Sequence, residues 1–518
     1  MKRTVRMKAA GIALVAALAV AGCGGGDDGG DAGSAAGTGG DLVMVRAEDS
    51  TSLLPPETSA NVDIWTLQQV YETLTVNRAD GSGVDPLLAT GWTTSDDGLT
   101  WTFDIRQGVT FHDGSPLTAA DVAWSLDFDR TESDTNQWWS IFSPIDSVTA
   151  PDDTTVEVVL SQPFPQLPAY LALFAAAVYP EDFADHDEAY MREHPIGTGP
   201  FMFREWVKGS SLSIAKYPGY WDPQFPYLDS VTFNVVPDDN TRMLQLQGGQ
   251  AQIDEFPSPA SMATLQQTSG VVAEDVESTQ VLFVNLNNRS EGLDDPVARR
   301  ALSYAVDRQS ILDTVLSGFG TVANSFLSPG LAGHDDQVDG GVFDMDLAKE
   351  TLAASEHPDG FPLTIEVSAG NSDYEQIAQV LQQSWGELGI DVTIKPVDGT
   401  VASSDRRAGT FDVQVGYATS DVVDPYQMVD FLVLTDGRGI NSGYTGEQVY
   451  GLADQLAATG DPAEQAELLS QIQQIVADEA PLIPIAFQPL LYAYSDQVQG
   501  FHSGVLGTYS LKTTSLED

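Results

Sequence analysis

The chain has 518 residues, of which 42% are hydrophobic, and its 23 Lys and Arg side chains face 75 Asp and Glu, for a formal net charge of −52. This hydrophobic content predicts a folded protein large enough for more than one domain, and it excludes a disordered chain. The negative charge argues against nucleic acid as a partner and against electrostatic binding to an anionic lipid surface.

The first 22 residues have the pattern of an export signal. Four basic side chains precede the apolar run Ala9–Val20, and small residues follow it. An apolar core of roughly 12 residues is shorter than the about 20 that a membrane-spanning helix needs. We therefore expect residues 1–22 to be a cleaved signal peptide.

Cys23 is the only cysteine, so it cannot form a disulfide within the chain. The tetrad Val20-Ala21-Gly22-Cys23 resembles the lipobox of bacterial lipoproteins, in which the signal is cut before the cysteine and the thiol is acylated. The resemblance implies lipid attachment at Cys23, and the alternative is an ordinary signal peptide that ends near a cysteine. Residues 23–40 are Gly-rich and lack an apolar face, which predicts a flexible tether.

Strands and helices alternate along the rest of the chain, which is typical of an α/β architecture. Apolar and polar patterning predicts strands at 41–48, 99–105, 231–236, 363–368, 392–397 and 413–417. Helices are predicted at 61–74, 296–317, 346–354, 374–388 and 447–480, the last broken near 460–462. Residues 148–160 read as a hairpin, and Thr118 with Asp121 forms a capping box that opens a helix.

Four segments form an ordered set of motifs. They are DPLLATGWTTSDDGLTWTFDIRQGVTFHDGSPLTAADVAWSL at 85–126, PIGTGPFMFREWVKGSSLSIAKYPGYW at 195–221, LFVNLNNRSEGLDDPVARRALSYA at 282–305 and APLIPIAF at 480–487. Together they resemble the family 5 solute-binding proteins, which are the dipeptide, oligopeptide and nickel receptors of ABC importers. The matching motifs span nearly all of residues 41–505.

The resemblance implies a two-lobed, periplasmic-binding-protein-like α/β fold of type II, cluster C, with an extra domain inserted in the first lobe. The expected division is 41–80, 197–284 and 496–518 for lobe I, 81–196 for the extra domain, and 285–495 for lobe II. Crossings near 281–287 and 488–494 would form a hinge, so that the lobes close on a ligand.

A binding residue follows from the same resemblance. In peptide-binding relatives, the segment that matches 411–431 has an Asp-x-x-Asp/Glu-Pro pattern, which here is Asp421-Val-Val-Asp424-Pro425. Asp421 then aligns with the carboxylate that pairs with the α-amino group of a peptide. A desolvated ammonium needs such a counter-charge, and a charge-assisted hydrogen bond contributes about 1.5–3 kcal/mol. The alternative is that Asp421 is simply one of the 75 acids of an acidic surface.

The chain departs from several peptide receptors just before Gly416-Tyr417. Those receptors carry an Arg that helps to hold short peptides, whereas this chain has Gln414. A neutral amide can donate a hydrogen bond but cannot neutralise a carboxylate. Arg406, Arg407 and Arg438 are the cations close in sequence, and Arg438 is the candidate in the Gly-rich loop.

Three aromatic residues are candidates for the lining of a cleft, namely Trp65, Tyr417 and Tyr444. For each, packing in the core or at its rim is the alternative. Asn441, in the same loop as Tyr444, is a further candidate for a ligand contact. No metal-ligand spacing or catalytic motif occurs in the sequence, so we expect no enzyme activity, catalytic residue, metal site or cofactor.

These observations predict a monomeric, lipid-anchored receptor on the extracytoplasmic face of the cell membrane, facing the periplasmic space in a cell with two membranes. It would capture a peptide or another amine-bearing solute and deliver it to the permease and ATPase subunits of an ABC transporter. Receptors of the same class for an oligosaccharide or a metal chelate are the alternatives. From another class, a surface hydrolase or a sensory lipoprotein could use the same fold.

Overall fold

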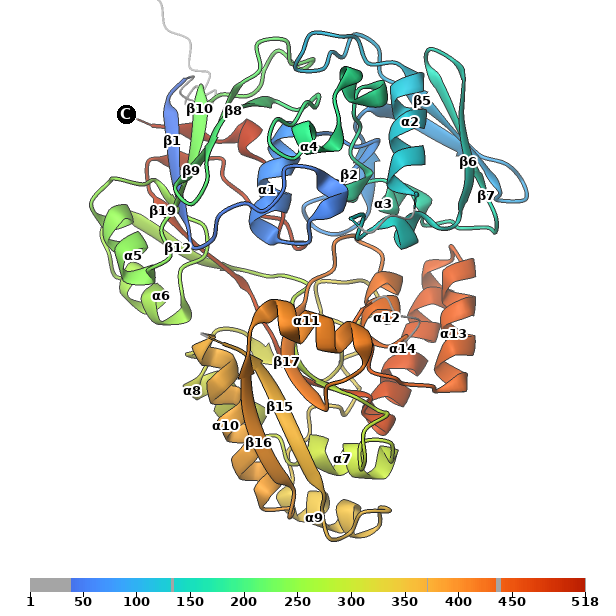
Figure 1. Ribbon diagram of the computed structural model, residues 1–518, viewed down its shortest axis with the longest axis vertical. Helices are drawn as coiled ribbons and strands as arrows, with labels where there is room; N and C mark the ends of the chain where they lie inside the picture. Colours follow the sequence, from blue (N-terminus) through green and yellow to red (C-terminus); the bar gives the residue numbers. More distant parts are fainter. Residues whose placement is uncertain (1–38, 132–134, 370, 435–438, 518) are drawn as a thin grey trace, which may run out of the picture. The chain divides into compact units, whose positions relative to one another are not determined.

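The computed structural model describes residues 39–131, 135–369, 371–434 and 439–517. Mixed helices and strands confirm the α/β class (Figure 1). Two large sheets organise these residues, and we call the seven-stranded sheet with its helices lobe I and the six-stranded sheet with its helices lobe II. No helix within the described ranges is both long and apolar enough to span a bilayer.

Lobe I is built around the first strand of the described chain. Its strands, in the order β12-β19-β11-β1-β10-β9-β8, are β12 (Val271–Val276), β19 (Leu490–Ser495), β11 (Ile253–Asp254), β1 (Asp41–Arg46), β10 (Ser230–Val235), β9 (Ser211–Lys216) and β8 (Phe201–Val207). β1 lies parallel to β10 and to β11, and Met44 stands opposite Phe233. The helices of this lobe are α1 (Asn61–Val70), α5 (Asp239–Gln247) and α6 (Pro259–Leu265).

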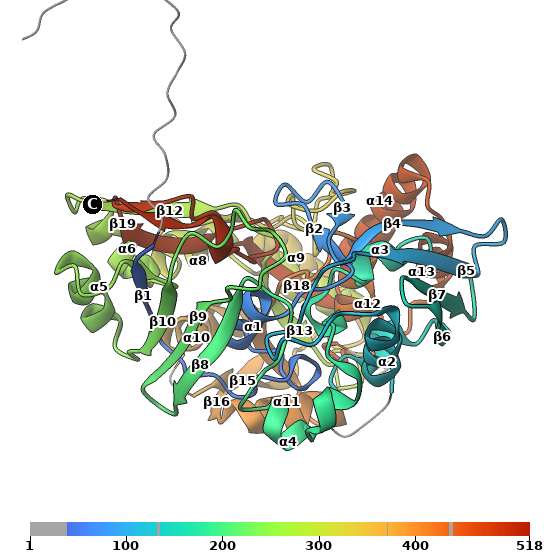
Figure 2. The same cartoon turned by 90° about the horizontal axis from the view of Figure 1, so that it is seen from above.

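A four-stranded antiparallel sheet is inserted between β1 and β8. Its order is β4-β5-β7-β6, with β4 (Ala89–Thr94), β5 (Thr100–Ile105), β7 (Thr155–Leu160) and β6 (Ile145–Asp152) (Figure 2). The pair β6–β7 confirms the hairpin predicted at 148–160. The capping box predicted for Thr118 and Asp121 is present at the start of α2 (Ala119–Asp129), where the Asp121 carboxylate accepts from Thr118 N at 2.7 Å.

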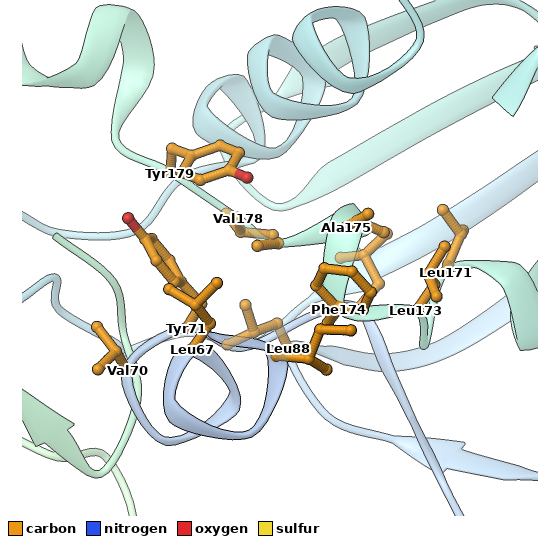
Figure 3. Packing of buried hydrophobic residues seen from close by; sticks show 14 of the residues in the cluster. Leu67, Val70, Tyr71, Leu88, Leu171, Leu173, Phe174, Ala175, Val178 and Tyr179 are labelled. Carbon is orange, nitrogen blue, oxygen red and sulfur yellow. The ribbon is translucent and has the colours of Figure 1, made fainter. Parts of the chain in front are cut away.

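The inserted segment shares one hydrophobic core with lobe I. Side chains of α1 and the residue after it contact the stretch 171–179, which includes the short helix that follows α3 (Leu167–Tyr170), as Figure 3 shows. Tyr71 and Tyr179 meet edge to face, with ring centroids 5.3 Å apart. Short elements complete this region, namely β2 (Thr75–Asn77), β3 (Val84–Pro86), α4 (Glu188–Met191), β20 (Val498–Gln499) and β21 (Ser515–Leu516).

Lobe II has helices on both faces of its sheet. The strand order is β14-β18-β13-β17-β15-β16, with β14 (Thr321–Val322), β18 (Leu482–Phe487), β13 (Val281–Leu286), β17 (Val413–Ala418), β15 (Pro362–Ser368) and β16 (Asp391–Val397). Alternate residues of β13 enter two different cores, Leu282 and Val284 one, Val281 and Phe283 the other. This is the period of two that a strand buried on both faces requires.

The helices of lobe II are α7 (Pro296–Tyr304), α8 (Arg308–Thr314), α9 (Met345–Ala353), α10 (Ser372–Gly386), α11 (Gly399–Ala408), α12 (Tyr426–Leu432), α13 (Glu447–Ala458) and α14 (Pro462–Glu479). The predicted break near 460–462 is confirmed. The single helix predicted at 296–317 is wrong, because Asp307 caps a new helix by accepting from Ser310 N at 2.9 Å. The turn buries Arg308, whose Nε donates to Pro484 O at 2.7 Å.

Two segments connect the sheets, 277–280 between β12 and β13, and 488–489 between β18 and β19. They are bonded to each other, since Gln488 N donates to Gln280 O at 3.0 Å and Ser278 Oγ donates to Gln488 O at 2.6 Å. The sequence predicts that lobe II extends to residue 495. In the structure the chain leaves lobe II at Pro489, and the apolar strand β19 that follows pairs with β12 in the sheet of lobe I.

Candidate functional site

The loop that follows β17 is built around the side chain of Gln427. Gln427 Oε1 accepts from Asp421 N at 2.8 Å and from Ser420 Oγ at 2.9 Å, and Gln427 Nε2 donates to Asp421 Oδ2 at 3.1 Å. Ser420 N donates to Thr279 Oγ1 at 3.0 Å, which ties the loop to the connecting segment 277–280. One amide side chain thus sets both the backbone of the loop and the direction of the Asp421 carboxylate.

Asp421 carries a carboxylate without a cationic partner. Its side chain is partly exposed, and no Lys, Arg or His of the described ranges forms an ion pair with it. Burial raises the pKa of Asp421 to about 6, against the smaller opposing effect of the hydrogen bond from Gln427. Burial also raises the pKa of the neighbouring Asp424 to about 7, and no described residue forms a hydrogen bond with the buried Asp424 Oδ2. Such a site favours a ligand that brings positive charge.

Tyr417 feels the charge of Asp421 and also the charge of an acidic residue in lobe I. The Tyr417 side chain, near the end of β17, is 49% exposed. The surrounding protein raises the pKa of its hydroxyl, and the charges of Glu48 and Asp421 raise it further. Glu48 lies two residues after β1 in lobe I, so one acidic group from each lobe acts on the pKa of this exposed phenol. Tyr374, at the start of α10, lies near enough for its pKa to be raised by Tyr417 as well as by burial.

A comparison of the sequence with protein-family profiles finds a match over residues 83–439 to the middle region of the bacterial extracellular solute-binding proteins, family 5. The chain belongs to this family. The predicted resemblance is therefore confirmed, and an extracytoplasmic location follows from membership. Proteins of this family serve ABC importers as receptors for peptides or related solutes.

Relatives of known identity cover most of the chain. The glutathione-binding protein GsiB of Salmonella typhi is 28% identical over 472 residues, which is 89% of this chain and 91% of that protein. The relative is a binding protein, not an enzyme.

Two solved structures share the fold, which confirms the two-lobed, periplasmic-binding-protein-like architecture. The periplasmic binding protein DppA of Helicobacter pylori, in complex with the peptide STSA, has a TM-score of 0.85 at 23% identity and covers 93% of this chain and 99% of its own. The dipeptide-binding protein of Pseudoalteromonas sp. SM9913, in complex with Met-Leu, has a TM-score of 0.82 at 23% identity and covers 92% and 100%.

The other predicted site residues do not gather around Asp421. Trp65 is only 3% exposed and stacks on Phe256 in the core of lobe I, with ring centroids 4.6 Å apart. Tyr444 is 3% exposed, and its hydroxyl donates to Glu479 Oε2 at 2.8 Å. Of the three aromatic candidates, Tyr417 alone presents a large exposed surface, and the other two pack in hydrophobic cores.

The two amide candidates are engaged inside lobe II. Gln414 is buried, and its Nε2 donates to Glu366 Oε2 at 3.0 Å and to Ala402 O at 2.9 Å. Asn441 accepts from Arg289 Nη2 at 2.8 Å and donates to the backbone carbonyls at the end of α11. Both amides therefore hold α11 and its neighbouring loop against the sheet, which is a positioning role in this conformation.

Arg438 and Cys23 lie outside the described residues. Arg406, on α11, is partly buried, and neither a carboxylate nor a carbonyl of the described ranges accepts from its guanidinium. Burial lowers the pKa of Arg406, and the neighbouring Arg407 lowers it further. An anion that binds next to this desolvated guanidinium would stabilise its charged form.

Sequence reasoning missed Glu48, Tyr374 and Gln427. Glu48 had one available signal, because it is an acidic residue two positions after the end of a buried strand. Gln427 had none, since an amide on a helix becomes a loop organiser only through its tertiary contacts. In the part of the chain that is described, no group of three or more His, Cys, Asp or Glu side chains could hold a metal ion.

Proposed function

We propose that this protein captures a peptide or another amine-bearing solute between its lobes and delivers it to the permease of an ABC importer. The observation that supports this most is the Asp421 carboxylate, oriented by Gln427, unpaired with any described cation and adjacent to Tyr417. Glu48 from the other lobe adds negative charge to the same place. An α-ammonium group supplies both the positive charge and the three N–H donors that such a site lacks.

The relatives support the same class of ligand. The ligands named for the relatives above all carry a free amino group, namely glutathione, the STSA peptide and Met-Leu. We place their common group at Asp421 in this chain. Arg406, whose partly buried guanidinium has no ion-pair partner among the described residues, is our candidate for binding a carboxylate at the other end of the solute. Gln414, which stays bonded to Glu366, takes no part in this assignment.

The test is calorimetric titration of the purified protein with glutathione and with a panel of dipeptides and tetrapeptides, each beside its N-acetyl derivative. We expect the Asp421→Asn protein to bind the best free-amine ligand at least tenfold more weakly, because a charge-assisted bond of about 1.5–3 kcal/mol corresponds to a factor of roughly ten to a hundred. The matched control is Asp454→Asn, which removes an exposed carboxylate on α13 and should leave affinity unchanged. Equal affinity of wild-type and Asp421→Asn proteins would refute the assignment.

We further propose that Cys23 is acylated after removal of residues 1–22 and that residues 23–40 tether the receptor to the cell membrane. Confinement to the membrane that holds the permease raises the effective concentration of the receptor. The Cys23→Ser protein should appear in the soluble fraction of fractionated cells, whereas the wild type sediments with membranes. Continued sedimentation of the Cys23→Ser protein would contradict lipidation.

A further inference from the structure

A cavity lies between lobe I and the inserted segment, and its lining includes no residue of the loop that holds Asp421. It is a cavity of about 320 Å³ enclosed by the C-terminal half of α1, the segment 71–79, residues 172–174 and the segment 502–513. Every residue of its lining comes from lobe I or the inserted segment, and none comes from lobe II. It opens toward solvent beside Val76 and Arg78, which are exposed. Its volume reaches the roughly 300–1,000 Å³ range of small-molecule sites.

One wall of the cavity carries a fixed carboxylate. Glu72 is 5% exposed and accepts from Tyr220 Oη at 2.9 Å, from Thr198 Oγ1 at 2.9 Å and from Trp221 Nε1 at 3.1 Å. These three donors come from two segments of the chain, at Thr198 and at Tyr220-Trp221, and hold the carboxylate in one orientation. Burial raises the pKa of Glu72, and the charge of Lys512 is among the effects that lower it.

The same cavity carries a cation that has no ion-pair partner. Lys512 lines the cavity near enough to act on Glu72, yet it is not in ion-pair contact with that carboxylate or with any other in the described ranges. Its Nζ lies 5.8 Å from the centre of the Phe225 ring. A lysine held this way keeps its three donors available to a guest.

Two amide groups on the lining are also unsatisfied. Gln68 Oε1 and Asn77 Oδ1 are buried and have no hydrogen-bond partner within the described structure. A buried polar group without a partner destabilises the folded state, so native proteins satisfy such groups by water or by a ligand. The apolar part of the lining, which includes Leu67, Phe174 and Leu506, can cover a small side chain.

We infer that this cavity is a second ligand site and that it takes a small zwitterion of free amino-acid size, with the ligand carboxylate on Lys512 and its ammonium toward Glu72 and the amide oxygens of Gln68 and Asn77. An anion alone would face the Glu72 carboxylate, and a cation alone would face Lys512. A zwitterion satisfies both charges, and its ammonium donors satisfy the free acceptors. This site is separate from Asp421, so the inference does not depend on the proposed function.

The test uses Asp421→Asn protein, in which the first site is impaired. Calorimetric titration with the free proteinogenic L-amino acids should find at least one that binds with a stoichiometry near one. Its N-acetyl and carboxamide derivatives should each bind at least tenfold more weakly, because each lacks one of the two charges. Adding Lys512→Gln should weaken binding of the free amino acid at least tenfold, whereas adding Lys349→Gln, which alters an exposed lysine on α9, should not.

Two outcomes would overturn the inference. Either no free amino acid binds to the Asp421→Asn protein, or binding occurs and is indifferent to Lys512→Gln. In both cases the cavity holds water only, or the amino acid sits elsewhere. If circular dichroism shows that the Lys512→Gln protein does not fold, Asn77→Leu replaces it, with the same expected tenfold loss and the same refuting result.

Discussion

The pKa of Asp421 makes the affinity for an amine depend on pH in a calculable way. An ammonium is attracted by the ionised carboxylate and not by the neutral acid. With a pKa of about 6 in the free protein, Asp421 is about 90% ionised at pH 7 and about 10% ionised at pH 5. A peptide keeps its α-ammonium and its α-carboxylate charged between these pH values. Lowering the pH from 7 to 5 should therefore weaken binding by about ninefold.

The assay is calorimetric titration of one free-amine ligand at half-unit steps between pH 5 and pH 8. Affinity should be highest near pH 7, fall as the pH drops through 6, and fall by about twofold toward pH 8, where the α-amino group of the ligand, with a pKa of about 7.7–8.0, loses its proton. Because Asp424, with a pKa of about 7, titrates in the same range, the Asp421→Asn protein is the necessary control, and its affinity should be weak and nearly flat. A flat profile for the wild type, or an equal slope in the Asp421→Asn protein, would refute the assignment of charge to Asp421.

Three further predictions concern the scaffold. Asp129 is buried, and neither of its carboxylate oxygens has a hydrogen-bond partner among the described residues. Burial holds the pKa of Asp129 well above the usual range, so the buried carboxyl costs stability as the pH rises above about 4. Asp129→Asn should therefore raise the melting temperature at pH 7.5 and progressively less toward pH 4, and an equal shift at both pH values would contradict this. Trp385→Ala should lower the free energy of unfolding by about 3–5 kcal/mol in urea titrations followed by circular dichroism, because the ring is fully buried, and a loss below about 1 kcal/mol would be inconsistent with its packing. Gln427→Leu should weaken ligand binding by roughly tenfold in a folded protein, since it removes the bond that orients Asp421, and unchanged affinity would show that the loop keeps its shape without that bond.

Local patterns predicted several elements correctly, for reasons that lie within a few residues. The capping box of Thr118 and Asp121 needs only a side chain and a backbone N–H three positions apart, and it is present. The hairpin at 145–160 and the break before Pro462 likewise follow from turn and cap chemistry in the immediate sequence. The helix predicted across Asp307 failed because its apolar pattern continues through a residue that caps a new helix and buries Arg308.

The pairing of strands that are distant in sequence does not follow from local patterns. The run 482–495 is apolar almost throughout, so no period distinguishes β18, which belongs to lobe II, from β19, which belongs to lobe I. The same limit applies to the candidate site. No local pattern in the sequence distinguishes the three aromatic candidates from one another. In the structure Trp65 and Tyr444 are each 3% exposed, whereas Tyr417 is 49% exposed.

The sequence by itself therefore determined the family, the α/β class and the position of Asp421 within an Asp-x-x-Asp-Pro motif, because each is written in contiguous residues. Tertiary structure decided what that carboxylate can do. Gln427 orients it, the absence of a cation among its described neighbours leaves its charge unpaired, and Glu48 adds negative charge from the segment after β1, more than 350 positions earlier. The cavity between Glu72 and Lys512 depends even more on the fold, because its two charges meet only when the end of the chain returns to the first helix.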